Sequence, residues 1–175
     1  MNLENIGEYV RGINFADPTW DLFVWLFFII GSFVYGFVMG KDRIVVMLVS
    51  IYMSFVVVKS VPLIDQIADK TLGSVSMFQI VLFFVLFLLL FALFDQLRVF
   101  DIGSGVGNRS IFKSIVFSIL HTGLIIAVTL SFLPKDLTDK FSFYIQKVFL
   151  SPLGYFLWTV MPILALVMLS GKSEK

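Results

Sequence analysis

Five long apolar runs, with nearly every charged residue at their borders, constrain the fold of this chain more than any other feature. The runs cover residues 20–40, 44–63, 76–97, 111–133 and 148–170. Each run contains about 20 residues, and a helix of that length, at about 1.5 Å per residue, covers a hydrocarbon core of about 30 Å. The sequence therefore predicts an all-α fold, a polytopic transmembrane bundle of about five spanning helices.

The composition agrees with this prediction and leaves little room for a second domain. Of the 175 residues, 59% are hydrophobic and 14% are charged, whereas soluble domains have about 45–50% and about 25%. We expect residues 1–175 to form a single membrane domain, because the runs and short connections use most of the chain. The net charge of +1 gives no general attraction for nucleic acid. The lack of cysteine excludes disulfides, thiolate catalysis and Cys-ligated metals.

Three shorter segments outside the runs have apolar residues at helical spacing. They cover residues 3–13, 64–72 and 137–148, and five crossings would place all three on one side of the membrane. One interpretation is that they are short amphipathic helices lying in the membrane interface. The alternative is that the pattern is common in any apolar connector close to lipid.

Charged residues at the borders of the runs predict an orientation. Lys41 and Arg43 lie between the first two runs, where the positive-inside rule acts most strongly. We therefore expect this turn and the C-terminus to be cytoplasmic and the N-terminus to be outside. Asp21, Arg109 and Lys113 mark other membrane borders, the last two at the level of the lipid headgroups.

Small residues in the first two runs predict a helix-packing surface. Ser32, Gly36 and Gly40 form a ridge at a spacing of four, and Ser50 and Ser54 place a notch on the second run. Small residues let membrane helices approach closely, because lipid tails provide no hydrophobic drive between helices. The ridge serves either self-association or packing of the first helix against the second, which the short turn between them favours.

The fourth run differs from the others because it has a polar face. This face contains Ser114, Ser118, His121, Thr122 and Thr129. An ionisable group within a span marks a bundle interior or a water-filled cavity. His121 is interpreted as a structural, hydrogen-bonded residue, with a cavity-lining role as the alternative. No second histidine, acidic pair or HExxH motif accompanies it, so we expect no catalytic residue, metal or cofactor.

Glycine and proline mark two irregular places. Gly103, Gly105 and Gly107 precede the fourth run, but the Lys-Ser/Thr pair of a phosphate-binding P-loop is missing. We therefore expect a flexible or re-entrant loop there. Pro162 removes a backbone donor inside the fifth run and should kink that helix, which is tolerated where neighbouring helices restore the lost bonds.

Several short motifs together resemble the colicin V production protein (CvpA) family. Trp20-Asp21 opens the first run, and the segment Gly36-Phe-Val-Met-Gly40-Lys-Asp-Arg43 leads directly into the second. Gly107-Asn108-Arg109 and the segment around His121 continue the resemblance, which covers about residues 20–133. The chain departs from the family pattern where Met39 replaces an arginine and Asn108 an aspartate. A fifth run also follows the usual four.

The resemblance implies a bacterial inner-membrane protein that supports peptide or toxin export or envelope homeostasis without enzymatic activity. Its expected partners are the lipid bilayer and a second copy or another membrane protein, not nucleic acid. The alternative is a small channel or transporter component, with a polar pathway along the fourth run. A third hypothesis is an intramembrane enzyme, which only His121 supports.

Overall fold

The computed structural model describes residues 20–38, 41–62, 64–71, 74–97 and 111–170, and all regular elements in these ranges are helical. Five helices are long: α2 (Trp20–Val38), α3 (Lys41–Ser60), α5 (Val75–Leu97), α6 (Ile111–Ser131) and α9 (Pro152–Ser170). Four connecting elements are short: α4 (Ile64–Thr71), α7 (Lys135–Thr138), α8 (Phe143–Ile145) and the π-helix η1 (Gln146–Leu150). The expectation of an all-α fold is confirmed.

The second long helix begins earlier than the apolar run predicts. Lys41 and Arg43 were expected in a turn, but α3 starts at Lys41, so both lie in its first turn. The backbone N–H groups of a first helical turn have no partners within the helix, and polar residues are well tolerated there. α3 ends at Ser60 rather than at residue 63, because Pro62 disfavours helical backbone at the residue before it.

The fifth run is not one continuous helix. The run 148–170 is divided at Ser151, whose ψ of 149° is extended, and the segments Phe143–Leu150 and Pro152–Met168 are bent by 49°. Pro152 explains the position of the break, since proline suits the first position of a helix and disfavours helical backbone just before it. Gly154 permits the tight junction, because a Cβ atom there would lie 2.4 Å from the carbonyl oxygen of Val148.

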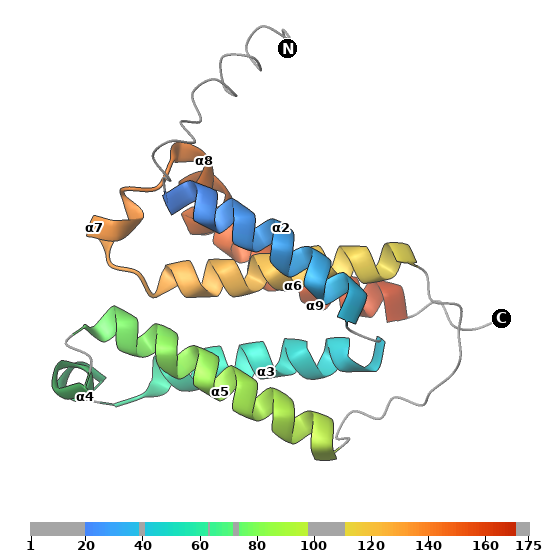
Figure 1. Cartoon of the computed structure of the whole chain (residues 1–175), viewed down its shortest axis with the longest axis horizontal. Coiled ribbons are helices and arrows are strands. Elements are labelled where there is room, and N and C mark those ends of the chain that lie inside the picture. The colour runs from blue at the N-terminus through green and yellow to red at the C-terminus, as the bar shows by residue number, and fades with distance from the viewer. Residues whose placement is uncertain (1–19, 39–40, 63, 72–73, 98–110, 171–175) are drawn as a thin grey trace, which may run out of the picture.

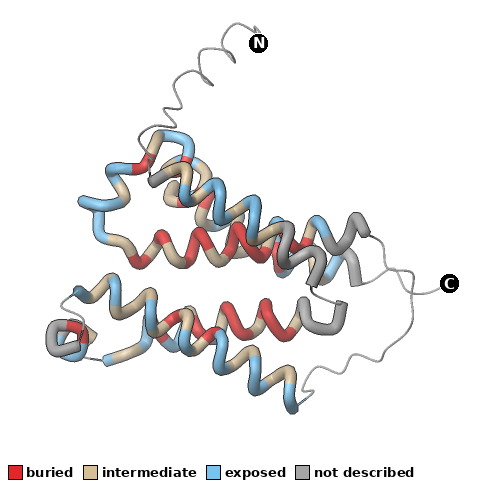
Figure 2. The backbone as a smooth tube through the Cα atoms, viewed as in Figure 1, coloured by how far each residue is buried: buried red, intermediate tan, exposed pale blue. Residues whose placement is uncertain are grey.

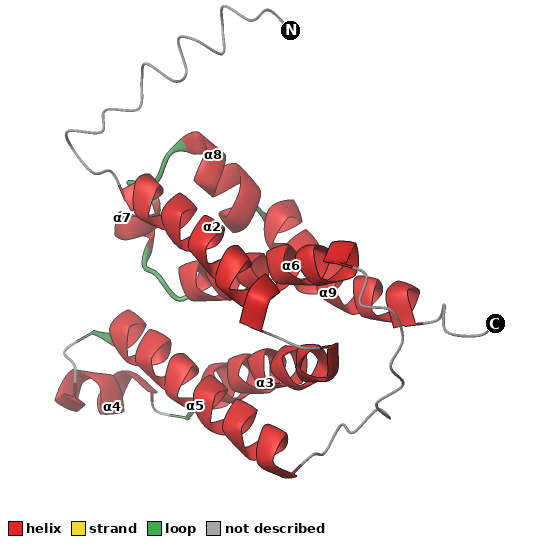
Figure 3. Cartoon of the chain, turned by 45° about the vertical axis from the view of Figure 1, so that its right-hand side comes forward, coloured by secondary structure: helices red, strands yellow, loops and turns green. Residues whose placement is uncertain are grey.

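The long helices pack in two connected groups. α6 packs against both α2 and α9, whereas α3 packs mainly against α5 and makes a smaller contact with α6 (Figure 1). Within the described ranges, α2 and α3 form no extensive contact, so the expected packing of the first two helices against each other is wrong there. The view in Figure 3 shows the same grouping, with α4 and α7 at the end of the bundle opposite the last residues of α2 and the first residues of α3.

Buried residues follow α3 and α6, while the outer sides of α2 and α5 are largely exposed (Figure 2). One core cluster joins α3, α5 and α6 through Ile51, Phe83 and Leu124. A second cluster joins α6 to the connector before α9 and includes Ala127, Phe141, Ile145 and Phe149. The apolar pattern in 137–148 thus partly reflects packing onto α6 rather than an interfacial face. The segment 3–13 lies outside the described residues.

Among the described helices, α5 alone is long and apolar enough by itself to cross a membrane. The bent pair Phe143–Leu150 and Pro152–Met168 adds a second candidate if it counts as one span. Shorter apolar helices cover Asp21–Ser32, Val45–Ser60 and Ile115–Ser131. The residues of α5 are exposed or half-buried except for Phe83 and Phe87, which agrees with the lipid-facing position that its uniformly apolar sequence predicts.

Candidate functional site

The polar face of α6 points into the bundle. Ser118, His121 and Thr122 are each at most 3% exposed. α2 covers this face so closely that a Cβ atom added at Gly31 would lie 3.0 Å from Cγ2 of Thr122. Thr129 is half-buried and donates a hydrogen bond to the carbonyl of Ile125. The side chain of Ser114 lies outside the described residues.

His121 is held by a hydrogen bond within its own helix. Its Nδ1 lies 2.8 Å from the carbonyl oxygen of Phe117. A carbonyl oxygen can only accept, so Nδ1 carries a proton and donates it to this carbonyl. The imidazole also packs against the Phe117 ring, with centroids 6.1 Å apart. This bond is the kind that a structural role for His121 requires.

The small residues of α2 and α3 pack differently from what the sequence predicts. Ser50 and Ser54 are fully buried, and each donates a 2.7 Å hydrogen bond to the carbonyl four residues earlier. On α2, the close approach to α6 is made by Gly31, one residue before the predicted ridge. The Ser32 hydroxyl is buried with no hydrogen-bond partner among the described residues. The surroundings of Gly36 and the whole of Gly40 lie outside the described parts of the chain.

Asp21, expected only as a border charge, makes a long-range contact. Both carboxylate oxygens accept the backbone N–H of Ser142, at 2.9 and 3.1 Å. Ser142 directly precedes α8, so the carboxylate ties the start of α2 to the connector that covers α6. The side chains of Lys41, Arg43, Arg109 and Lys113 lie outside the described residues.

A group of hydroxyls that the sequence interpretation did not identify joins three helices. The Tyr52 hydroxyl of α3 donates to the backbone carbonyl of Thr159 in α9. Thr159 Oγ1 in turn donates to the carbonyl of Tyr155 at 3.0 Å. Tyr155 and Ser131, the last residue of α6, line one pocket. The sequence feature that could have revealed this group is the presence of Tyr52 and Tyr155 in otherwise apolar runs, because a buried phenol needs a hydrogen-bond partner.

An aromatic cluster, formed by Trp25, Phe28, Phe149 and Trp158, fills the space between α2, η1 and α9. Trp158 stacks on Phe149 with centroids 5.4 Å apart, and its Nε1 donates to the carbonyl of Val148 at 3.0 Å. The indole also lies against the backbone of Gly123 in α6, where a Cβ atom would come within 2.1 Å of the ring. Gly123 is therefore required for this packing.

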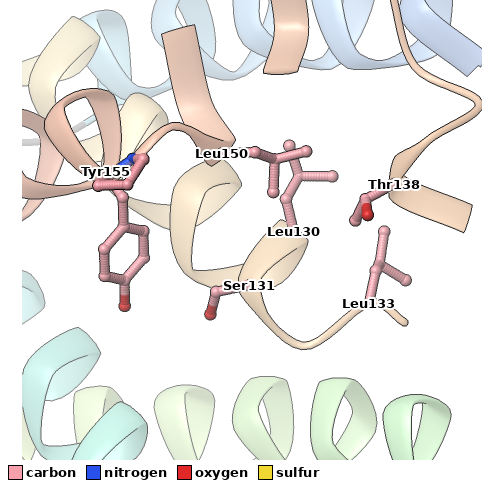
Figure 4. Close-up of a pocket in the computed structure, with 7 residues that line it drawn as sticks. Leu130, Ser131, Leu133, Thr138, Leu150 and Tyr155 are labelled. Atoms are coloured by element: carbon pink, nitrogen blue, oxygen red, sulfur yellow. The ribbon is translucent and has the colours of Figure 1, made fainter. Parts of the chain in front are cut away.

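A pocket of about 340 Å³ opens where α6 ends and α9 begins. Leu130, Leu133 and Leu150 give it an apolar wall, and the hydroxyl-bearing side chains are Ser131, Thr138 and Tyr155 (Figure 4). Ser131 and Thr138 donate their own protons to the carbonyls of Val128 and Lys135, at 2.7 and 3.1 Å. The pocket thus combines an apolar wall with hydroxyl oxygens.

In the part of the chain that the structure describes, no group of three or more His, Asp or Glu residues is arranged to hold a metal ion. Comparisons with protein-family models, with curated proteins and with solved structures find no match to this chain.

Proposed function

We propose that this chain is an integral inner-membrane protein that crosses the bilayer five times and acts without enzymatic activity. In this proposal it supports peptide or toxin export or envelope homeostasis, as a CvpA-like factor. The observation that carries the proposal is the distribution of polarity, with apolar side chains outside and polar side chains inside the bundle.

The outer surfaces of three helices are dominated by large apolar side chains. Examples are Phe27 at 52% exposure on α2, Leu88 at 60% on α5 and Met168 at 74% on α9. Soluble monomers rarely expose continuous apolar surface over more than a few hundred Å². In contrast, Ser118, His121 and Thr122 are buried. Hydrocarbon around the bundle is the environment that best fits this arrangement.

Helix lengths and connections support five crossings. The long helices contain 19 to 23 residues, which corresponds to about 28–35 Å and suits a hydrocarbon core of about 30 Å. α4 and α7, which follow the second and fourth long helices, lie at the same end of the bundle (Figure 1). Five crossings require this arrangement of the connectors.

The proposal of a non-enzymatic factor rests on the internal polar groups and on the sequence motifs. Among the described residues, the buried hydroxyls of Ser50 and Ser54 and the His121 ring all bond to backbone carbonyls of their own helices. Such groups stabilise the bundle and leave few side chains for chemistry. The resemblance around Trp20-Asp21 and Gly36–Arg43 adds the link to export.

A complementation experiment tests the functional part of the proposal. The chain is expressed in a bacterium that lacks its own CvpA-family gene, and export of a peptide toxin is measured. We expect export to be restored, and a Gly123→Ala variant with disturbed packing should restore less. Normal membrane insertion without restored export would contradict the proposed role. Reporter fusions after Arg43 and after Asp69 test the orientation, which predicts the first inside and the second outside.

The pocket at the end of α6 is the observation that favours a second candidate, a small channel or transporter component. Ser131, Thr138 and Tyr155 give this pocket hydroxyl groups. A transport pathway would have to continue from there along α6 past His121. An ion-flux measurement on His121→Leu, described below, separates this candidate from the first.

A further inference from the structure

The pocket between α6, α7 and α9 has a polarity that selects one class of ligand. We infer that it binds the headgroup of a phospholipid that carries a primary ammonium group. The inference rests on the proposed membrane location. It is argued from three properties of the pocket: the direction of its hydroxyl protons, the helix end that borders it, and its apolar wall.

The hydroxyl groups of the pocket present acceptors rather than donors. A hydroxyl has one proton and two lone pairs. Ser131 uses its proton on the carbonyl of Val128, and Thr138 uses its proton on the carbonyl of Lys135. Tyr155 lines the same pocket, and its phenolic oxygen can accept a hydrogen bond as well as donate one. A ligand that bonds to these oxygens must therefore supply N–H or O–H groups.

The end of α6 favours a positive charge at the same place. α6 ends at Ser131, α7 at Thr138 and η1 at Leu150, and all three residues line the pocket, whereas only α9 begins there, at Pro152. The C-terminal end of a helix carries the equivalent of about half a negative charge, so cations are stabilised there. A primary ammonium group combines this charge with three N–H donors. A trimethylated ammonium group has the charge but lacks the donors.

The apolar lining and the volume of the pocket also fit the headgroup region of a lipid. Leu130, Leu133 and Leu150 offer apolar contact. The volume of about 340 Å³ falls at the lower end of the range of about 300–1,000 Å³ for small-molecule sites, which is enough for a headgroup but not for a whole lipid. Lys135 and Lys140 are exposed and do not line the pocket. The pocket lining therefore contains no cation that would compete with the ammonium group.

Native mass spectrometry of the purified full-length protein in detergent tests the inference. The protein is mixed with equal amounts of dioleoyl phosphatidylethanolamine and dioleoyl phosphatidylcholine, which share the same chains and differ in methylation of the ammonium group. We expect about fivefold higher retention of phosphatidylethanolamine, the effect of one or two hydrogen bonds. Adding soluble phosphoethanolamine should not displace the bound lipid, because the apolar wall contributes to binding.

Two substitutions in the pocket and one control outside it test whether the lipid binds there. The double variant Ser131→Ala and Thr138→Val should bind both lipids equally. Ser60→Ala should keep the preference, because Ser60 bonds to the carbonyl of Val56 in the same way but is exposed on α3. Equal retention of the two lipids by the unmodified protein, retention of neither, or an unchanged preference in the double variant would overturn the inference. Displacement by phosphoethanolamine would also overturn it, in favour of a soluble amine ligand. None of these results affects the five crossings, which cysteine labelling tests separately.

Discussion

The Tyr52 hydroxyl of α3 donates a hydrogen bond to the backbone carbonyl of Thr159 in α9, a residue 107 positions away in the chain. Pro162 lies three residues after Thr159 and is fully buried. A proline inside a helix removes a backbone donor and disturbs the bonds of the preceding turn. The carbonyl that loses its donor to Pro162 is that of Trp158, so the Tyr52 bond to the adjacent Thr159 carbonyl ties α3 to the turn that the proline weakens.

Replacing Tyr52 by phenylalanine should destabilise the protein, because the bond is lost while the ring remains. We expect a loss of about 1 kcal/mol and a midpoint of thermal unfolding about 2–4 °C lower. Circular dichroism in detergent measures the change. Ser60→Ala is the control, since it removes an exposed hydroxyl that bonds only within α3, and it should shift the midpoint much less. Equal shifts in the two variants would refute the role of this bond.

Pro162→Ala provides a second test of the same relationship. Alanine restores the backbone N–H that bonds to the Trp158 carbonyl, so the turn that includes Thr159 becomes regular and the bond from Tyr52 should matter less. In a double-mutant cycle, Tyr52→Phe should cost less in the Pro162→Ala background than in the unmodified protein, with a coupling of at least about 0.5 kcal/mol. Additive effects would show that the proline and the tyrosine act independently.

Gly123→Ala should be strongly destabilising. The added methyl group would lie 2.1 Å from the Trp158 ring, which is fixed by its stacking on Phe149 and its bond to Val148. Overpacking of this kind costs about 1–3 kcal/mol or more. Gly31→Ala is the comparison, because its methyl group would meet Thr122 at 3.0 Å. Denaturant titration followed by circular dichroism should rank Gly123→Ala as clearly less stable, and the reverse order would contradict the described packing.

Removing the Asp21 carboxylate should loosen the connector that covers α6. Asp21→Ala deprives the Ser142 N–H of its acceptor, and bonds to charged groups contribute about 1.5–3 kcal/mol. Hydrogen exchange at residues 134–142 should become faster than in the unmodified protein. The control is Asp136→Ala, an exposed residue of α7. Unchanged exchange in Asp21→Ala would mean that the contact does not hold the connector.

His121→Leu separates a structural histidine from one that lines a transport pathway. The protein is reconstituted in liposomes, and proton and potassium fluxes are compared for the two forms. We expect neither form to raise the flux above that of protein-free liposomes, because the polar face of α6 is buried under α2. A flux that is present in the unmodified protein and absent in His121→Leu would favour the transport candidate.

The sequence predicts where helices lie better than which helices meet. The run 76–97 matches α5 (Val75–Leu97) almost to the residue, since neither proline nor glycine interrupts it. The division of the fifth run could have been predicted from Pro152, because proline suits the first position of a helix. The start of α3 could not be predicted in this way, because its first turn, Lys41–Arg43, is polar and lies outside the apolar run.

The choice of packing partners depends on faces that the apolar runs hardly distinguish. α2 is apolar on most sides, so its sequence does not reveal that Gly31 lies against Thr122 of α6. The polar face of α6 was apparent because Ser118, His121 and Thr122 stand out in an apolar run. The Tyr52–Thr159 and Asp21–Ser142 bonds could not be predicted from the sequence. One partner of each bond is a backbone group, which almost any residue could supply.

Cysteine labelling tests the five crossings most directly, because the chain contains no cysteine of its own. Single substitutions are made at Asp42, Asp69, Ser104, Asp136 and Ser173, with Leu89→Cys in the exposed middle of α5 as the buried-in-lipid control. Intact cells are treated with a membrane-impermeant maleimide. We predict labelling at positions 69 and 136 only, labelling at 42, 104 and 173 after permeabilisation, and none at 89. Labelling of positions 42 and 69 from the same side would contradict the five-span account.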